Sequence, residues 1–537
     1  MRGLRMLLRF RWVSHILAPG IFLSAVVLRV TLFGPGHYLP GDSGDTLLNL
    51  FFFEHNISSL SDLASWSSAA FYFPVEGVRG WSDHLFLPTL VYAPFRLLGL
   101  NQYVSLSLWF FVVLLVNYVS LRSFLWLAGG RGWISTSVCI VCSFNHALVA
   151  QLNHLQLLML WFFPFLAYAL LRFRWTWVLL AVGLNWLVAP YLGVTSILIV
   201  SAYLLVGVIL WRRSFVQRLC CLQSWRVSVF VFVSLCGVVA ANTFLIQPYL
   251  QTASRMGVRG TDEILKNLPN VWAWLSGTGR FIWGLSPSSH VYGNEPYLFP
   301  GFILSFFFVL TTLLMKRLDI GRRSLLLSGI LLALAVTSFE GWTLWWLPML
   351  SVPSVRAMNA AGRIAAVLWF ISAFPIMVIV ESVFLEVMQR RRILSSTILS
   401  VLVLVSVFSV FPKSSDAFDV SGWLADRKGF SWSVSAAGCD VIHFNAGAGF
   451  PWHGDVFAMH SILDSPDLRS VSGYSGWQPR DGWTPGMSAE KAFEWMRHNL
   501  GREGYASADS LPDDYVACSL RPSKQYVQGS GLFDVEK

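Results

Sequence analysis

Long apolar segments separated by short clusters of arginine and lysine run through the first 411 residues of this 537-residue chain. About 20 apolar residues are needed to cross the hydrocarbon core of a bilayer, and basic residues beside such segments favour the cytoplasmic side. Hydrophobic residues make up 55% of the sequence and charged residues only 13%. The pattern therefore predicts an all-α polytopic membrane domain whose basic loops are cytoplasmic.

The positions of the charges predict a topology. Arg2, Arg5, Arg9 and Arg11 favour a cytoplasmic N-terminus, and about eleven crossings then leave the C-terminus outside the inner membrane of a bacterium. The net charge of +10 resides largely in these loops, so we expect no nucleic-acid partner. The predicted spans cover residues 14–33, 102–121, 133–150, 155–171, 175–190, 193–211, 227–246, 297–315, 324–338, 363–385 and 393–411.

Two domains are expected. Residues 1–411 form the membrane domain, with external loops at 34–101 and 247–296. Within the first loop, Pro88, Pro94 and Arg96 interrupt an apolar stretch at 85–99, which predicts an interfacial or re-entrant helix.

Residues 412–537 are polar and are expected to form a small exported α/β domain. The sequence predicts strands near Cys439–Phe444 and Tyr515–Leu520 and an amphipathic helix from Ser488 to Leu500. Cys439 and Cys518 are the two cysteines of this tail. Export would allow them to pair, but their spacing leaves the pairing open.

A loop with two carboxylates, Gly41-Asp42-Ser43-Gly44-Asp45-Thr46, follows the first span. Asp45 is well placed to cap a surface helix from Thr46 to Leu60, whereas Asp42 has no evident structural role. Two acids at the outer surface of a membrane suit a general base or a ligand of a divalent cation such as Mg²⁺ or Mn²⁺. We therefore take Asp42 and Asp45 as candidate catalytic or metal-binding residues.

Further candidates for binding a substrate or its phosphate have structural alternatives. His55, within the predicted surface helix, is either an interfacial polar residue or part of the site. His154 satisfies a helix end or donates to a phosphate oxygen. Glu295 interacts with a helix dipole or with a ligand. Four arginines match the geometry of a phosphate group or pair with nearby acids: Arg255, Arg259, Arg356 and Arg363.

Several short motifs occur in a particular order along the chain. They are the acidic loop, Phe71-Tyr72-Phe73-Pro74, Ser82-Asp83-His84-Leu85, His154-Leu155-Gln156, Pro248-Tyr249-Leu250, the run from Ser354 to Arg363, and Gly473-Tyr474-Ser475-Gly476. In this order the chain resembles bacterial multi-spanning membrane glycosyltransferases of the GT-C superfamily, in the branch with a short exported tail. The resemblance covers most of the chain.

The resemblance implies an enzyme that uses a polyprenyl-phosphate sugar, within the membrane lipid, and a glycan, lipid or protein acceptor on the outer face. It also implies that an acid of the first external loop, Asp42 or Asp45, acts as base or metal ligand. We expect Arg356 or Arg363, with His154 or a divalent cation, to stabilise the departing phosphate. This mechanism requires the early acids and late arginines to converge.

Two alternatives belong to other classes. A transporter or flippase of a lipid-linked or amphipathic solute would use the same arginines, but it also needs ionisable residues along a path through the membrane. The predicted spans before residue 381 contain almost none. A non-catalytic envelope-glycan assembly factor would present a lipid-linked sugar through its tail, and its role would survive loss of both loop acids.

Overall fold

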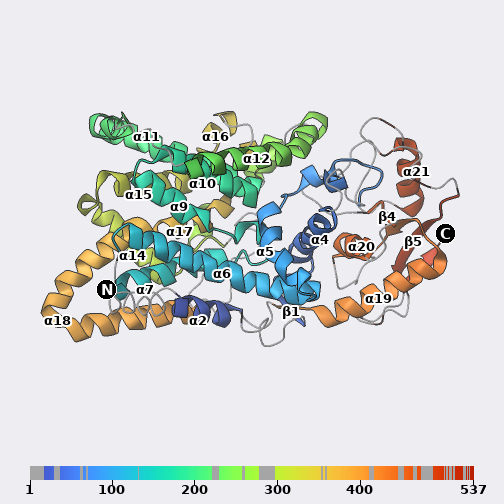
Figure 1. Ribbon diagram of the computed structural model, residues 1–537, viewed down its shortest axis with the longest axis horizontal. Helices are drawn as coiled ribbons and strands as arrows, with labels where there is room; N and C mark the ends of the chain where they lie inside the picture. The colour runs from blue at the N-terminus through green and yellow to red at the C-terminus, as the bar shows by residue number, and fades with distance from the viewer. Residues whose placement is uncertain are drawn as a thin grey trace. The chain divides into compact units, whose positions relative to one another are not determined.

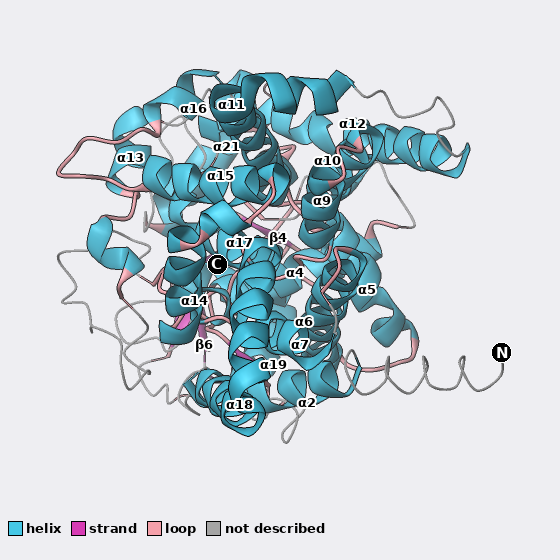
Figure 2. Cartoon of the chain, turned by 90° about the vertical axis from the view of Figure 1, so that its left-hand side faces the viewer, coloured by secondary structure: helices cyan, strands magenta, loops and turns pink. Residues whose placement is uncertain are grey.

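The computed structural model describes most of the chain. The described residues are 17–28, 37–60, 65–67, 71–130, 132–220, 229–256, 260–276, 297–351, 355–356, 358, 360–409, 417–445, 453–463, 468–472, 488–500, 502, 506, 511, 514–523, 528, 530 and 533–536. Helices dominate, and the strands are few and short (Figures 1 and 2).

Within these residues, five helical segments are long and apolar enough to cross a membrane: Gln102–Leu127, Gly132–Val149, Pro190–Arg212, Val231–Ser254 and Ala361–Val387. Four apolar segments are shorter: Ala18–Val27, Leu155–Leu171, Trp175–Val188 and Phe302–Leu313. The predicted class, a helical membrane protein with a small sheet, is confirmed. The predicted eleven crossings are not, because helices of 10–17 residues fall short of the usual spanning length.

The chain divides into two compact units. Unit 1 comprises Met1–Arg29, Phe110–Asn242 and Val258–Lys413, and unit 2 comprises Val30–Trp109, Thr243–Gly257 and Ser414–Lys537. The division at residue 411 stays a prediction, since the tail belongs to the same unit as the first predicted external loop.

Unit 1 is built from helices. They include α2 (Ala18–Val27), most of α6 (Gln102–Leu127), α7 (Gly132–Ser143), α8 (His146–Val149), α9 (Phe162–Leu171), α10 (Trp175–Val188), α11 (Pro190–Cys220), the first half of α12 (Val229–Met256), α13 (Thr261–Lys266), α14 (Phe302–Leu313), α15 (Ile320–Val336), α16 (Trp346–Ser351), α17 (Ile364–Ile371) and α18 (Ala373–Ser409).

Two polar side chains of α6 hydrogen-bond the backbone near the ends of neighbouring helices. The side-chain amide of Asn117 in α6 donates to the carbonyl oxygen of Leu158 at 2.7 Å and accepts from the backbone N–H of Leu160 at 2.9 Å. The Ser120 hydroxyl donates to the carbonyl oxygen of Trp161, at the start of α9. These contacts join α6 to the residues that lead into α9.

Unit 2 combines helices with two small sheets. Its elements are β1 (Tyr38–Pro40), α4 (Asp45–Ser58), α5 (Phe86–Leu97), β2 (Ala417–Asp419), α19 (Val420–Ala437), β3 (Val441–Phe444), α20 (Gly454–Ile462), β4 (Arg469–Ser470), α21 (Ala489–Asn499), β5 (Ala517–Pro522) and β6 (Phe533–Glu536). β1 and β2 are antiparallel. The other sheet has the order β4-β3-β5-β6, with parallel β4-β3 and β3-β5 pairs and an antiparallel β5-β6 pair.

The first predicted external loop completes the core of the tail. Phe73 packs in one apolar cluster with Val441 of β3 and with Phe493 and Met496 of α21. The backbone N–H of Phe73 also donates to the carbonyl oxygen of Ser470 at 2.9 Å. Neither segment buries these apolar side chains alone, which explains why segments far apart in sequence fold as one unit.

The predicted secondary structure of the tail is confirmed by β3, β5 and α21. Ser488 caps α21 by accepting a hydrogen bond from the backbone N–H of Lys491. The cysteine pairing that the sequence left open is also answered, since Cys439 and Cys518 form a disulfide within unit 2.

The helix predicted over residues 46–60 exists as α4, but the expectation of a surface helix is wrong. Phe51, Phe52 and Phe53 are all buried, because three consecutive large apolar residues point around more than one side of a helix and each needs a partner. The stretch predicted to be interfacial or re-entrant contains α5, which at 12 residues is too short for a crossing.

Candidate functional site

The acidic loop is held by its own side chains. One carboxylate oxygen of Asp42 accepts a hydrogen bond from the backbone N–H of Gly44 at 2.9 Å, a local turn typical of aspartate. The Thr46 hydroxyl donates to the carbonyl oxygen of Pro40 at 3.1 Å. Asp42 thus has the structural role that the sequence did not reveal.

Asp45 is the first residue of α4 and not its cap. Gly44 occupies the cap position, without a side-chain cap hydrogen bond. A carboxylate in the first turn still interacts favourably with the helix dipole. Asp45 is partly buried and Asp42 is exposed, so Asp42 is the more accessible of the two acids.

Residues of the tail contact this loop on both sides. Before it, β1 pairs with β2, and the backbone N–H of Val420 donates to the carbonyl oxygen of His37 at 2.8 Å. After it, helix α20 packs beside α4 (Figure 1). The backbone N–H of His453 lies 3.3 Å from the hydroxyl oxygen of Ser43.

The buried imidazole of His460 makes a second contact with α4. Its Nε2 atom lies 2.7 Å from the carbonyl oxygen of Leu47, and its ring meets those of Phe51 and Trp423 edge to face. A carbonyl oxygen only accepts, so Nε2 carries the hydrogen. Burial, together with a smaller effect from the charge of Arg427, lowers the pKa of His460 to about 3. His460 is therefore neutral at physiological pH.

The ring of His453 lies within electrostatic reach of both loop acids. Burial lowers the pKa of His453, while the charges of Asp45 and Asp42 act to raise it. A Cβ atom added to Gly44 would lie 3.7 Å from Cδ2 of this ring and 3.3 Å from Oδ1 of Asp42. The structure thus brings Asp42, Asp45 and His453 together.

His453 is not among the site residues predicted from the sequence. The only local signal is the unusual grouping Trp452-His453-Gly454-Asp455 in a polar tail. Asp455, two residues further on, has a pKa raised to about 6 by burial. Titratable groups with displaced pKa values often gather at functional sites.

His55 lies farther along α4, where its contacts support the fold. Its Nε2 atom is 3.1 Å from the carbonyl oxygen of Trp66, and its ring stacks on Phe51. Burial lowers the pKa of His55 to about 4, with a smaller effect from the charge of Arg79. Its role in substrate binding stays a prediction.

The neighbouring Glu54 joins α4 to α5. Its carboxylate accepts from Nε of Arg96 at 2.7 Å and from Nη2 of the same residue at 3.1 Å, and it accepts from the Tyr92 hydroxyl as well. Such a two-point pairing fixes geometry as well as charge. Glu54 therefore holds the two helices together.

Arg79, another residue absent from the sequence-based candidates, organises the Ser82-Asp83-His84-Leu85 motif. Its guanidinium is fully buried, lies 4.0 Å from the ring centre of Phe52, and donates to the carbonyl oxygens of Asp83 at 2.8 Å and His84 at 2.6 Å. Burial lowers the pKa of Arg79 to about 10, so the group remains charged at neutral pH. Its role is to fix this loop.

Three candidates belong to unit 1. His154 is buried just before a short 3-10 helix (Leu155–Leu157), where its carbonyl oxygen accepts from the backbone N–H of Leu157. Arg356 is partly buried, with Nε 3.4 Å from the carbonyl oxygen of Met349. Arg363 is partly buried immediately before α17.

The remaining candidates have no described side chains. Arg255 lies near the end of α12, but its side chain is outside the described part of the chain. Arg259 and Glu295 lie entirely outside the described residues. Because Asp42 and Asp45 belong to unit 2 and His154, Arg356 and Arg363 to unit 1, their convergence stays a prediction.

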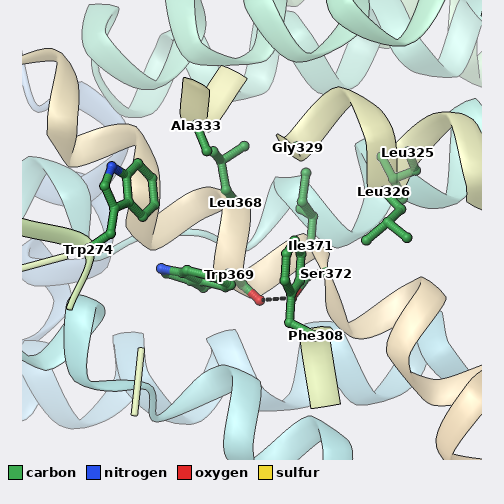
Figure 3. Close-up of a pocket in the computed structure, with 10 residues that line it drawn as sticks. All are labelled: Trp274, Phe308, Leu325, Leu326, Gly329, Ala333, Leu368, Trp369, Ile371 and Ser372. Atoms are coloured by element: carbon green, nitrogen blue, oxygen red, sulfur yellow. Dashed lines mark hydrogen bonds between the residues drawn. The ribbon is translucent and has the colours of Figure 1, made fainter. Parts of the chain in front are cut away.

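Unit 1 also contains an apolar pocket with an empty volume of about 360 Å³. Figure 3 shows Phe308 from α14, residues of α15 and Trp369 from α17 around it, with Trp274 at one side. The hydroxyl of Ser372 donates to the carbonyl oxygen of Trp369 at 2.7 Å. Such a lining offers apolar contact and little chemistry.

Asp42 and Asp45 supply the oxygen ligands that Mg²⁺ prefers. Among the residues whose positions are described, however, no group of three or more His, Cys, Asp or Glu side chains is arranged to hold a metal ion. The divalent cation stays a prediction.

Comparison with known proteins gives no family. No protein-family model matches the chain, and no curated protein is significantly similar to it. The acidic loop and its neighbours are therefore the main structural basis for a function.

Proposed function

We propose that this chain is a membrane glycosyltransferase that moves a sugar from a polyprenyl-phosphate donor to an acceptor hydroxyl at the external face of a bacterial inner membrane. The observation that carries the proposal is the acidic loop. Its exposed Asp42 carboxylate is held in a tight turn, next to Asp45 and the imidazole of His453, in a chain whose described residues include five helices of spanning length.

The reaction assigns Asp42 the role of general base. As the acceptor oxygen attacks the anomeric carbon, Asp42 takes the hydroxyl proton. A new bond forms between this oxygen and the carbon, while the bond between the carbon and the phosphate oxygen breaks. The electron pair of the broken bond leaves with the phosphate. Arg356 and Arg363 are the proposed phosphate contacts, because guanidinium groups match phosphate geometry.

The disulfide between Cys439 and Cys518 supports an external location for this chemistry. Disulfides persist in oxidising compartments and are rare in the cytosol. The disulfide and the acidic loop belong to the same unit, and β1 pairs with β2 directly. The proposed topology therefore has a cytoplasmic N-terminus and an external C-terminus.

The test is transfer in vitro by the purified protein, with a panel of polyprenyl-phosphate sugars. Asp42→Asn keeps the side-chain shape and removes the base, so we expect turnover to fall by about 10²–10⁴-fold. Asp45→Asn is the companion variant. Asp514→Asn is the matched control, because this exposed aspartate belongs to the same unit.

Unchanged turnover in Asp42→Asn would rule out Asp42 as the general base. If the unaltered protein transfers sugar from none of the donors, the proposed reaction is rejected. Replacing Arg356 and Arg363 in turn by Met is expected to raise the donor KM. The control variant should behave as the unaltered protein throughout.

A further inference from the structure

The acidic loop is bracketed by contacts with a segment more than 370 positions later in the chain. On one side, Tyr38 to Pro40 pair with Ala417 to Asp419. On the other, the hydroxyl of Ser43 meets the backbone N–H of His453, and the carbonyl oxygen of Leu47 meets the imidazole of His460. These contacts fix both ends of the segment that carries Asp42 and Asp45.

Within this frame, the position of His453 follows from the helix that begins after it. The backbone N–H of Phe457 donates to the carbonyl oxygen of His453 at 2.9 Å, so His453 starts the first turn of α20. His460 lies seven residues further, about two turns along the same helix. Both contacts with the acidic loop and α4 therefore come from one helix, His453 at its start and His460 two turns later.

We propose that His453 is a positioning residue for the acid pair, through which the C-terminal segment completes the site of the first external loop. The inference rests on the proposed function. The His453 ring lies beside Gly44 and within electrostatic reach of both carboxylates, where an imidazole N–H can donate to a carboxylate oxygen and hold its orientation. Asp42 then keeps the geometry needed to receive the acceptor proton.

Three variants separate positioning from folding. His453→Ala removes the ring, His453→Phe retains an aromatic ring of similar bulk without nitrogen, and His453→Gln supplies an amide donor close to the position of Nε2. His498→Ala is the matched control, since His498 is an exposed histidine of the same unit. Formation of the Cys439–Cys518 disulfide on a non-reducing gel reports that unit 2 has folded.

For His453→Ala and His453→Phe we expect kcat to fall about 100-fold, the loss that follows a misplacement of about 1 Å, while the acceptor KM stays within about threefold. His453→Gln should recover most of the lost rate. If kcat stays within about threefold of the unaltered protein in both the Ala and the Phe variant while Asp42→Asn is inactive, the positioning role of His453 is overturned and the proposed glycosyltransferase is not. Failure of the Gln variant to recover any rate would reduce His453 to a packing role.

A second measurement needs no donor. Carbodiimide labelling of Asp42 and Asp45 in the full-length protein, read by peptide mass spectrometry, should increase in His453→Ala and His453→Phe and return toward the unaltered level in His453→Gln. Equal labelling in all variants would overturn the inference even if the transfer assay showed no reaction. Increased labelling without any transfer would support the positioning role and reject the glycosyltransferase.

Discussion

The Nε2 atom of His460 lies 2.7 Å from the backbone carbonyl oxygen of Leu47, although 413 positions separate the two residues. The imidazole is fully buried between Phe51 of α4 and Trp423 of α19. The tail is therefore tied to the helix that carries the acidic loop by a contact that water does not reach.

Replacing His460 by Ala should destabilise unit 2 by about 3 kcal/mol, because its hydrogen bond to the Leu47 carbonyl is lost and a cavity opens beside two aromatic rings. Thermal unfolding of the detergent-solubilised protein measures the loss. His498→Ala should shift the midpoint little, since the residue is exposed. Equal stability of the two variants would contradict the structural role of His460.

The same residue predicts a loss of stability in acid. The folded-state pKa of His460, about 3, lies below the unfolded value near 6.5, so the unfolded chain binds more protons in between. Its stabilising contribution is complete above pH 6.5 and declines as the pH falls toward 3. The pH dependence of the unfolding midpoint should be shallower in His460→Gln, and identical slopes would refute the prediction.

Asp455 should act in the opposite direction. Burial raises its folded-state pKa from 3.8 to about 6, so the folded chain binds more protons than the unfolded chain between these values, and stability decreases as the pH rises through them. Asp455→Asn should raise the unfolding midpoint at pH 7.5 and leave it unchanged below pH 4. The comparison variant, Asp514→Asn, should have no effect at either pH.

Arg79 should tolerate no substitution well. Its buried guanidinium donates to two carbonyl oxygens and lies over the ring of Phe52. Arg79→Met should therefore lower the free energy of unfolding by about 3 kcal/mol or more. Arg79→Lys should rescue only part, because a compact ammonium does not reproduce the planar fork. Chemical denaturation measures both, with the exposed Arg497→Ala as control. Full stability of the Lys variant would count against the proposed geometry.

The disulfide predicts a dependence on redox conditions. Protein purified without reductant should yield a peptide that links Cys439 to Cys518. The free energy of unfolding of the double Cys→Ser variant should be lower by about 4 kcal/mol at most, because the unfolded chain gains the entropy of a released loop of this length. Recovery of both tail cysteines as free thiols would also weaken the proposed external topology.

Local sequence patterns were enough to predict part of this molecule. The structure contains β3, β5 and α21 where the sequence predicts strands around Cys439–Phe444 and Tyr515–Leu520 and an amphipathic helix from Ser488 to Leu500. The acidic loop was chosen because two carboxylates beside a span are unusual. Each of these signals lies within about a dozen consecutive residues.

The surroundings of the loop could not be predicted in this way. His453 and His460 contact Ser43 and Leu47 across more than 400 positions, and no local periodicity encodes such a pairing. The predicted number of crossings stays unconfirmed, because apolar composition alone does not separate a spanning helix from a shorter one, as the 12-residue helix Phe302–Leu313 illustrates.

The pairing of β1 with β2 has a consequence for biosynthesis. Residues Tyr38 to Pro40 leave the ribosome early, whereas their partners Ala417 to Asp419 are made after all five spanning helices of the described residues. At roughly 5–20 residues per second, the early strand waits on the order of tens of seconds for its mate. A chain that stops short of the tail would carry both aspartates and still be an unfinished protein.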